Sequence, residues 1–324
     1  MTTSLGSRQP AASPLMKASR VHRFGSPEVI AFEDIERPEP GEGEVLVRVA
    51  AAGVGPWDGW IRAGKSVLPQ PLPLTLGSDL SGTVEATGPG ATGFAPGEEV
   101  FGVTNARFTG AYAEYALASA GMIARKPGRI GHVEAASLPV VAVTAWQALL
   151  EQAQLGRTQT VLVLGGAGNV GAYAVQIAHR AGARVIATAS AGDLAYLRSL
   201  GADEAVDRRD RLEDRVEPVD AVIDLVGGEV QTRSFAVLKR GGRLVSAVSQ
   251  PDQQEAARRG VTAGFFLVQV TTAHLERIAA MVDAGELAMQ IGSILPLAAA
   301  QAAHEMLEGA RPHPRGKIIL QIGS

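Results

Sequence analysis

Cysteine is absent from the 324-residue chain, which excludes disulfides, thiol nucleophiles, iron–sulfur clusters and zinc sites with a cysteine ligand. Aromatic residues are scarce at 5%, and 30 Lys+Arg against 33 Asp+Glu leave a net charge of −3. Because no long run of one charge occurs, the sequence does not indicate binding to nucleic acid. A chain without cysteine is compatible with the cytoplasm, where we expect the protein.

Long hydrophobic runs are also missing. The longest uncharged stretch, residues 158–178, contains four glycines and an asparagine, so a strand–turn–helix explains it better than a membrane span. Residues 1–15 are small, polar and rich in proline and serine, without the apolar segment of a secretory signal. We expect them to be a flexible extension, with Met16 opening a soluble, folded protein that does not bind membranes.

The chain length predicts about two domains. The first third contains short strand candidates separated by Gly/Pro turns, which is typical of a compact antiparallel barrel or sandwich: 45–54, 80–88, 98–103 and 111–118. From about residue 139, apolar strands alternate with helical stretches, which predicts a parallel sheet covered on both faces: 160–166, 169–182, 183–189, 194–201, 220–227, 234–242 and 243–249.

The C-terminal part has a mixed pattern. Residues 264–270 read as the last strand of the parallel sheet, and helices are expected near 272–285 and 297–309. A final strand at 317–322 follows a helix, so we expect it to return to the first domain and make that domain discontinuous.

A GxGxxG motif follows a predicted strand and opens a predicted helix. In our interpretation Gly166 allows the tight turn, Gly168 lets the backbone approach a pyrophosphate, and Gly171 permits close helix–strand packing. Asn169 and Val170 begin the helix, whose free N–H groups and partial positive charge favour phosphate. The motif is weak alone, but the strand, turn and helix around it favour dinucleotide binding over an ordinary glycine-rich turn.

Two other enzyme classes share parts of this pattern. A class I methyltransferase places an acidic residue at the end of its second strand, as does an NAD site, but here Thr188-Ala189-Ser190 has none until Asp193. A short-chain dehydrogenase needs a tyrosine four residues before a lysine, and none of the four tyrosines meets this condition. Both classes are disfavoured, and the missing acid leaves room for a 2′-phosphate.

From Met16 onward the chain resembles the zinc-independent, quinone oxidoreductase-like branch of the medium-chain dehydrogenases/reductases. The stretches that carry the resemblance occur in the family's order: PEPGEGEVLVRVAAAGV (38–54), LGSDLSGTVEATG (76–88), GAYAEY (110–115), LPVVAVTAWQALL (138–150), VLVLGGAGNVG (161–171), SLGADEAVD (199–207), VIDLVGG (222–228), LKRGGRLVS (238–246) and RGKIIL (315–320).

The resemblance implies an α/β protein in which a doubly wound Rossmann domain with a parallel sheet interrupts a GroES-like, β-rich catalytic domain. The expected boundaries are 16–138 and 288–324 for the catalytic domain and 139–287 for the Rossmann domain. The substrate cleft lies between the two domains. The implied reaction is NADPH-dependent reduction of quinones, enones or related activated double bonds.

Zinc is not expected. The zinc alcohol dehydrogenases to which the chain is similar carry a cysteine near the position of Gly55 and a Gly–His–Glu run at Gly77-Ser78-Asp79, so no ligand set remains. The six histidines show no metal-ligand spacing. Two further positions depart from the family: Gly55 stands where an asparagine is usual, and Asp193 lies close to the place of a basic residue.

Candidate catalytic and substrate residues follow the first long strand. By resemblance this loop faces the nicotinamide, where Trp57 and Trp60 would form a stacking wall, although either ring could instead fill the domain core. Asp58 could relay a proton or bind a cofactor hydroxyl, or simply cap the turn. The resemblance also places Ser78 in the substrate site.

Further candidates lie along the expected cofactor crevice. Thr144, predicted at the start of a helix, would bond the nicotinamide side or cap the helix. Ser249 and Gln250 follow a strand whose end opens on the crevice, with Val248 beside them. Phe265 and Phe266 would form a wall of the cleft or a subunit contact. By resemblance, Leu225, Phe266 and Lys317 also belong to the cofactor site.

We predict NADPH rather than NADH as the cofactor. Ser190 presents a hydroxyl where an NAD site has a carboxylate, and Arg208 follows the neighbouring strand, where its guanidinium would bind a 2′-phosphate. The alternative for Arg208 is a solvated side chain paired with Asp210. Asp193 is contrary evidence, since it would repel the phosphate if it pointed inward.

The predicted reaction is hydride transfer from NADPH to a quinone or an electron-poor C=C, with protonation from solvent. An enoyl-thioester reductase is a less favoured alternative. From a different class, a protein that binds NADPH without turnover would use the same fold. We also expect a homodimer, because the apolar segment 264–270 has no lysine or proline to block edge pairing.

Overall fold

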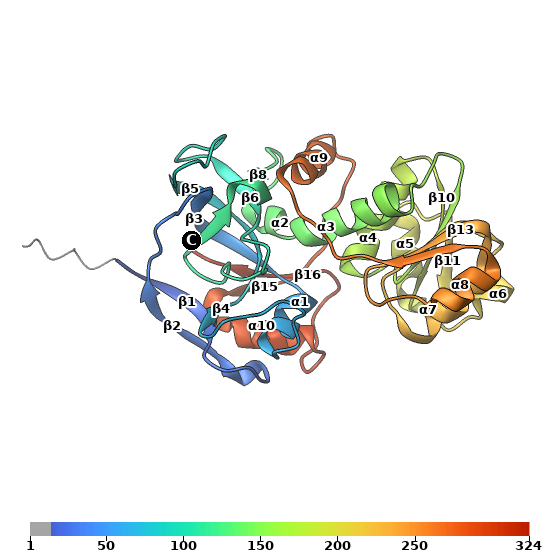
Figure 1. Ribbon diagram of the computed structural model, residues 1–324, viewed down its shortest axis with the longest axis horizontal. Helices are drawn as coiled ribbons and strands as arrows, with labels where there is room; N and C mark the ends of the chain where they lie inside the picture. Colours follow the sequence, from blue (N-terminus) through green and yellow to red (C-terminus); the bar gives the residue numbers. More distant parts are fainter. Residues whose placement is uncertain (1–13, 324) are drawn as a thin grey trace, which may run out of the picture.

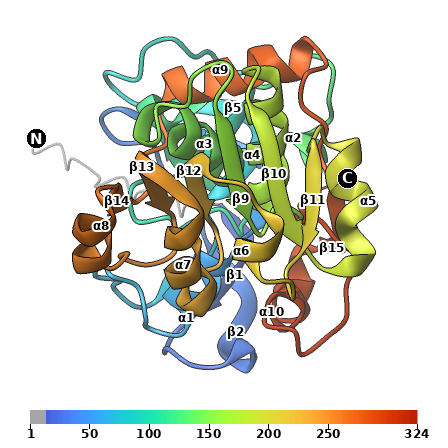
Figure 2. The ribbon, with the colours of Figure 1, turned by 90° about the vertical axis from the view of Figure 1, so that its right-hand side faces the viewer.

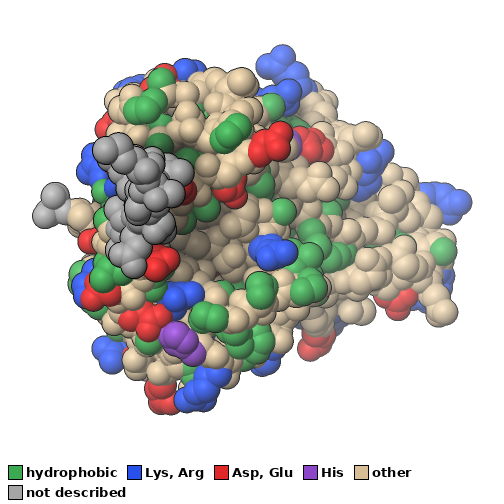
Figure 3. Space-filling view, turned by 60° about the vertical axis from the view of Figure 1, so that its left-hand side comes forward, with side chains coloured by type: hydrophobic (Ala, Val, Ile, Leu, Met, Phe, Trp, Pro, Cys, Tyr) green, Lys and Arg blue, Asp and Glu red, His purple; other side chains and the backbone are tan. Residues whose placement is uncertain are grey.

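The computed structural model describes residues 14–323 and has two lobes with helices α3 and α4 between them (Figure 1). The expected extension therefore lies mostly outside the described residues. β1 already begins at Leu15, one residue before the predicted start. No helix within residues 14–323 is both long and apolar enough to cross a bilayer. Acidic and basic side chains intermingle over the face in Figure 3.

The first lobe is built on β-sheet. A seven-stranded sheet has the order β15-β16-β3-β5-β6-β8, with β7 also paired to β3, and a smaller sheet has the order β2-β1-β4. The strands are β1 (Leu15–Val21), β2 (Ile30–Glu36), β3 (Glu44–Val54), β4 (Leu74–Thr75), β5 (Asp79–Thr87), β6 (Glu99–Val103), β7 (Tyr115–Ser119), β8 (Ile123–Arg125), β15 (Ile291–Pro296) and β16 (Lys317–Gln321). The helices are α1 (Pro56–Arg62), α2 (His132–Ala136) and α10 (Ala300–Leu307).

The end of the chain returns to this lobe, as the sequence pattern predicted. β16 pairs antiparallel with β3, and Leu320 lies opposite Ala52. Both strands are almost entirely buried, which explains why their apolar runs do not alternate with polar residues. The pairing places the residues just before β16 at the junction between the lobes (Figure 1).

The second lobe contains a six-stranded parallel sheet with the order β11-β10-β9-β12-β13-β14, seen side by side in Figure 2. Its strands are β9 (Thr160–Leu164), β10 (Arg184–Ala189), β11 (Glu204–Asp207), β12 (Val219–Asp224), β13 (Leu238–Ser246) and β14 (Thr262–Phe265). Its helices are α3 (Pro139–Trp146), α4 (Asn169–Arg180), α5 (Leu194–Ser199), α6 (Leu212–Arg215), α7 (Gly228–Ser234) and α8 (Gln253–Arg259). Helix α9 (Thr272–Asp283) follows β14 and lies beside β8 of the first lobe (Figure 1).

Strand β9 shows why this sheet is covered on both faces. Val161 and Val163 join one apolar core with Ile177 of α4, whereas Leu162 and Leu164 join a separate core with Phe235. Successive side chains of a strand point to opposite faces, so every residue of β9 after the first is buried. The expected α/β architecture is confirmed.

Three predicted segments differ from the structure. The strand predicted at 111–118 begins only at Tyr115, because the N–H of Tyr112 donates to the carbonyl of Leu76, outside any ladder. Within 234–242, the helix α7 ends at Ser234, a short 3-10 turn follows, and β13 starts at Leu238. The edge strand expected at 264–270 is β14, which is shifted toward the N-terminus and ends at Phe265.

Candidate active site at the domain junction

The turn between β9 and α4 depends on its glycines, but not in the way expected. Gly165 is the residue with a positive φ, +79°, whereas Gly166 has an ordinary backbone conformation, so the assignment of the tight turn to Gly166 is wrong. A Cβ on Gly166 would lie 2.9 Å from the Cβ of Ala187 on β10. A Cβ on Gly171 would lie 2.2 Å from the carbonyl oxygen of Gly165, so both positions require close packing.

The N-terminus of α4 is open to a ligand. Its N-cap, Gly168, is exposed and provides no side-chain cap, although the helix is 12 residues long. The first N–H groups of a helix lack partners within it and carry a partial positive charge, which stabilises bound phosphate. Gly168 and Asn169 therefore fit a dinucleotide pyrophosphate.

Asp224 at the end of β12 organises the neighbouring loops. One carboxylate oxygen accepts the N–H groups of Val226 and Gly227 at 3.1 and 2.8 Å, and the other accepts Ser246 Oγ and Gln231 Nε2, both at 2.8 Å. This network fixes the carboxyl ends of β12 and β13, the edge at which open α/β sheets bind ligands.

These loops carry several of the predicted cofactor residues. Leu225 is half-buried, and Ser249 accepts a hydrogen bond from Gln231 Nε2 at 3.2 Å. Val248 is 42% exposed and Gln250 is exposed, while Phe265 and Phe266 follow at the end of β14. The structure therefore places the predicted group along one edge of the sheet.

Across the junction, the first lobe contributes a buried ion pair. Lys317 Nζ lies 2.9 Å from Asp79 Oδ2, and both side chains are almost completely buried. Asp79 Oδ1 accepts the N–H of Val140 at 3.2 Å, near the start of α3. Burial raises the pKa of Asp79, and the neighbouring Lys317 opposes this shift.

Trp57 packs against this pair. The ammonium of Lys317 lies 4.5 Å from the centre of the Trp57 ring, and the indole N–H donates to Ser78 Oγ at 2.9 Å. A Cβ on Gly55 would lie only 2.3 Å from the same ring. The ring therefore occupies the space that an asparagine at position 55 would need, which explains the departure from the family pattern.

Asp58 is buried beneath this cluster and caps α1. One of its oxygens accepts the N–H of Gly55 at 2.8 Å and the hydroxyl of Tyr112 at 3.1 Å. Burial raises the pKa of Asp58 to about 7, against smaller opposing effects of the Gly55 hydrogen bond and Lys317. Asp58 has no exposed surface, so the geometry favours the capping role, and the proton-relay role remains a hypothesis.

Two other expectations change. Trp60 is 54% exposed, so its ring does not fill the domain core. Thr144 lies near the end of α3 rather than at its start, and its hydroxyl donates to the carbonyl of Val140 at 2.7 Å. Thr144 therefore does not cap the N-terminus of a helix. Its side chain has a single hydrogen-bond donor, the hydroxyl, and this donor is already bonded within α3.

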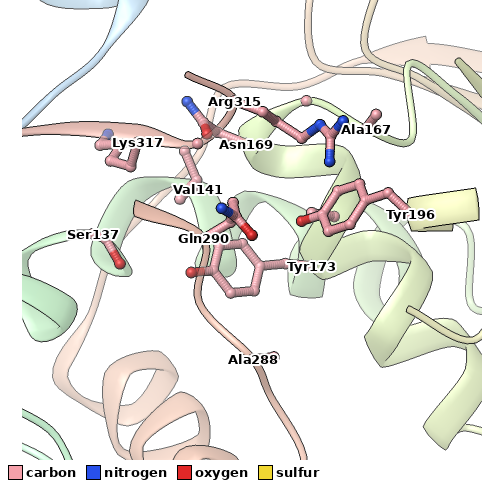
Figure 4. A pocket seen from close by; sticks show the side chains of 13 residues that line it. Ser137, Val141, Ala167, Asn169, Tyr173, Tyr196, Ala288, Gln290, Arg315 and Lys317 are labelled. Carbon is pink, nitrogen blue, oxygen red and sulfur yellow. The ribbon is translucent and has the colours of Figure 1, made fainter. Parts of the chain in front are cut away.

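A pocket joins the two lobes at the glycine-rich turn (Figure 4). Ala167, Gly168 and Asn169 line it from the second lobe, and Gly316 and Lys317 line it from the first. The remaining lining residues are Ser137, Val141, Ala172, Tyr173, Tyr196, Ala288, Gln290 and Arg315. The candidate phosphate site and Lys317 thus line one space.

The end of β10 has an arrangement that the sequence did not predict. Ser190 Oγ donates to Asp193 Oδ2 at 2.6 Å, and Asp193 Oδ1 forms an ion pair with Arg315 from the first lobe. Arg208 is exposed, and Asp210 lies nearest Arg215 instead, so the alternative pairing of Arg208 with Asp210 is not observed.

Comparisons with known proteins agree with this architecture. Residues 41–128 match the family model for the alcohol dehydrogenase GroES-like domain, and residues 200–320 match the one described as zinc-binding dehydrogenase. The quinone oxidoreductase of Homo sapiens is 32% identical over 328 residues, covering 95% of this chain and 98% of the relative. The chain belongs to the medium-chain dehydrogenases/reductases, in the quinone oxidoreductase branch.

Other members show the range of this family. The 2-methylene-furan-3-one reductase of Solanum lycopersicum is 37% identical over 251 residues, covering 73% of this chain and 64% of that protein. The structure of the quinone oxidoreductase from Coxiella burnetii superposes with a TM-score of 0.88 at 34% identity, covering 96% of this chain and 100% of that one.

The zinc implied by one family description does not fit the residues present. Ser78 and Asp79, at the positions of zinc ligands in related dehydrogenases, are bonded to Trp57 and Lys317. Within residues 14–323, no group of three His, Asp or Glu side chains is arranged to hold a metal ion.

Sequence reasoning missed several residues of this site. The sequence pattern marks Asp79 only as the residue at a zinc-ligand position of related dehydrogenases, and it gives Tyr196 no role. Arg315 lies inside the RGKIIL stretch, which indicates the family but no role for this arginine. The return of β16 to β3 was the one available signal, because it brings the residues before Lys317 to the junction.

Proposed function

We propose that the chain is an NADPH-dependent reductase that transfers hydride to a quinone or to an activated C=C, such as an enone or enal, without zinc. The observation that carries the proposal is the pocket in which the uncapped N-terminus of α4 faces Lys317 across the domain junction. The quinone oxidoreductase and 2-methylene-furan-3-one reductase relatives support this class of acceptor.

The bound nicotinamide cofactor would supply the hydride. The N-terminus of α4, through Gly168 and Asn169, would hold the pyrophosphate, while Leu225, Val248 and Ser249 at the strand ends would contact the rest of the cofactor. These contacts fix the position of the reacting ring relative to the substrate, which lowers the entropic part of the barrier.

The residues at the junction favour conjugate reduction over reduction of a simple carbonyl. Trp57 forms a flat, half-buried wall beside Lys317, and exposed Trp60 lies one helical turn further along. Asp58 is buried and hydrogen-bonded, and residues 14–323 offer no set of zinc ligands, so neither would supply a strong acid to the substrate oxygen. The enolate or hydroquinone oxygen would be stabilised by hydrogen-bond donors and protonated from solvent.

The test follows NADPH absorbance with a panel of quinones, enones, enals and enoyl thioesters. Oxidation with quinones or enones that persists after chelator treatment and dialysis would support the proposal. Turnover of thioesters alone would favour the enoyl-thioester alternative. Tight NADPH binding without turnover of any acceptor would instead favour a binding protein that uses the same fold.

A further inference from the structure

An ion pair joins the two lobes beside the candidate adenosine site. Asp193, in the loop after β10, pairs with Arg315, which precedes β16. The guanidinium also lies 4.3 Å from the centre of the Tyr196 ring. In Figure 4 the Arg315 side chain extends over Tyr196 toward Ala167 of the glycine-rich turn.

This pairing changes the charge at the end of β10. Both oxygens of Asp193 are used, one by Ser190 and the other by Arg315, so the carboxylate is neutralised and held in place. A guanidinium has five N–H donors, and the Arg315 side chain is 38% exposed. Arg315 therefore keeps donors for a second anion next to Ser190.

The position suits one particular phosphate. In Rossmann domains the group that contacts the adenosine 2′ position follows the glycine motif by about 20 residues, where this chain has Ser190. Arg315 reaches the same loop through Asp193 and also lines the pocket with Gly168 and Asn169. A cofactor with its pyrophosphate on α4 would thus place its adenosine ribose beside Arg315.

We propose that Arg315, contributed by the catalytic lobe, determines cofactor specificity by binding the 2′-phosphate of NADPH, with Asp193 and Tyr196 holding its guanidinium in position. This inference rests on the proposed function for the identity of the cofactor. It replaces an arginine within the Rossmann lobe, Arg208, as the principal phosphate ligand. It also explains why a carboxylate, Asp193, can lie beside a phosphate site: its charge is compensated by Arg315.

The first test measures dissociation constants for NADPH, NADH, 2′,5′-ADP and 5′-AMP by calorimetry, so that it does not depend on turnover. Arg315→Ala should weaken NADPH and 2′,5′-ADP by about tenfold or more, the loss expected for a charged hydrogen bond. NADH and 5′-AMP should change little. Arg315→Lys should recover only part of the affinity, because an ammonium cannot stack on Tyr196 and bind Asp193 and a phosphate at once as a planar guanidinium can.

Arg311→Ala is the matched control. Arg311 is an exposed arginine of the same loop that pairs with Glu305 and does not line the pocket, so its loss should leave all four constants unchanged. Thermal unfolding of each variant, compared with the native protein, verifies that the fold is retained.

A double variant tests the role of Asp193. In Arg315→Ala the carboxylate of Asp193 is left unpaired and repels the phosphate, so adding Asp193→Asn should restore part of the lost NADPH affinity. No recovery, or a selective loss in Arg208→Ala instead of Arg315→Ala, overturns the assignment.

The outcomes separate this inference from the proposed reaction. If Arg315→Ala weakened the binding of NADPH and NADH equally, Arg315 would contact the pyrophosphate or only hold the two lobes together. That result would overturn its role in cofactor specificity without contradicting the proposed reductase activity. Selective loss of NADPH binding in a protein that reduces no acceptor would support Arg315 and refute the proposed reduction.

Discussion

At the residue scale, Gly55 and Trp57 are tightly packed beside Lys317 at the domain junction. Position 55 has an extended backbone, with φ −133°, so glycine is not required there by its conformation. It is required because the Trp57 ring lies 2.3 Å from where a Cβ would be. The Trp57 ring fills the space that a side chain at position 55 would occupy. The effects of mutations at the two positions on stability should therefore depend on each other.

We therefore predict that Gly55→Ala destabilises the protein by about 1–3 kcal/mol, as overpacking of a close-packed site does. Trp57→Ala should remove most of this penalty when the two changes are combined. Urea unfolding of the single and double variants gives the coupling energy. Gly121→Ala is the control, because a Cβ there would meet nothing within 4 Å. Additive effects of the two changes would contradict the prediction.

Asp58 leads to a prediction about pH. Its pKa is about 7 in the folded protein and near 3.8 when unfolded, so the folded state binds more protons between these values. Stability contributed by this group must therefore fall as pH rises from about 4 to 7 and stay constant above that range. At about 1.4 kcal/mol per pKa unit, the native protein should lose up to ~3 kcal/mol between pH 5 and 8.

The measurement is the free energy of unfolding in urea at pH 5 and pH 8, compared with Asp58→Asn. The asparagine keeps an oxygen for the Gly55 N–H and the Tyr112 hydroxyl but does not titrate, so its unfolding free energy should decrease less over this range. Identical pH dependence in the two proteins would show that Asp58 is not the titrating group.

At the element scale, the Lys317–Asp79 pair ties together β16, β5 and α3. Removing one partner would leave a buried charge unpaired, which costs about 3–5 kcal/mol. We expect Lys317→Met or Asp79→Leu alone to have this effect, and the double variant to be substantially more stable than either. Urea unfolding measures the difference. The exposed pair Lys17–Asp34 is the control, where Lys17→Met should cost at most about 1 kcal/mol.

Elements with strong local signals were predictable from the sequence, and elements set by distant contacts were not. The apolar run of β9 and the glycines before α4 are local signals for a strand and for the start of a helix. The predicted bounds of both elements therefore agree with the structure to within two residues. The predicted strand at 111–118 failed because Tyr112 bonds to the loop before β5. Periodicity carries no information about such a partner.

The same distinction separates the site residues. The structure brings Gly168, Asn169 and Lys317, which local motifs and the family resemblance single out, to one pocket. Arg315 could not be found in this way, because its partner Asp193 is 122 residues earlier in the chain and in the other lobe. An ion pair across two domains becomes visible only when the chain is folded.

At the scale of the whole molecule, each of the two larger sheets has an edge strand that must be covered or blunted. β15 borders the first sheet and β14 borders the parallel one. Exposed Phe265 ends β14, and Leu267, which is 62% exposed, follows it, whereas no lysine, arginine or proline lies within 262–267. Such an edge pairs readily with another strand, and a two-fold contact between identical edges closes the assembly.

We therefore propose a homodimer that pairs β14 with its counterpart, and we predict a dimer mass by light scattering at micromolar concentration. Leu267→Lys combined with Phe265→Lys should give a monomer, because each copy would bring two positive charges to the paired edge. Ile294→Lys, on the other edge strand and 52% exposed in the native protein, is the control and should leave the dimer intact. A native monomer would refute the dimer itself, whereas a dimer that survives the double lysine variant but dissociates in Ile294→Lys would move the interface to β15.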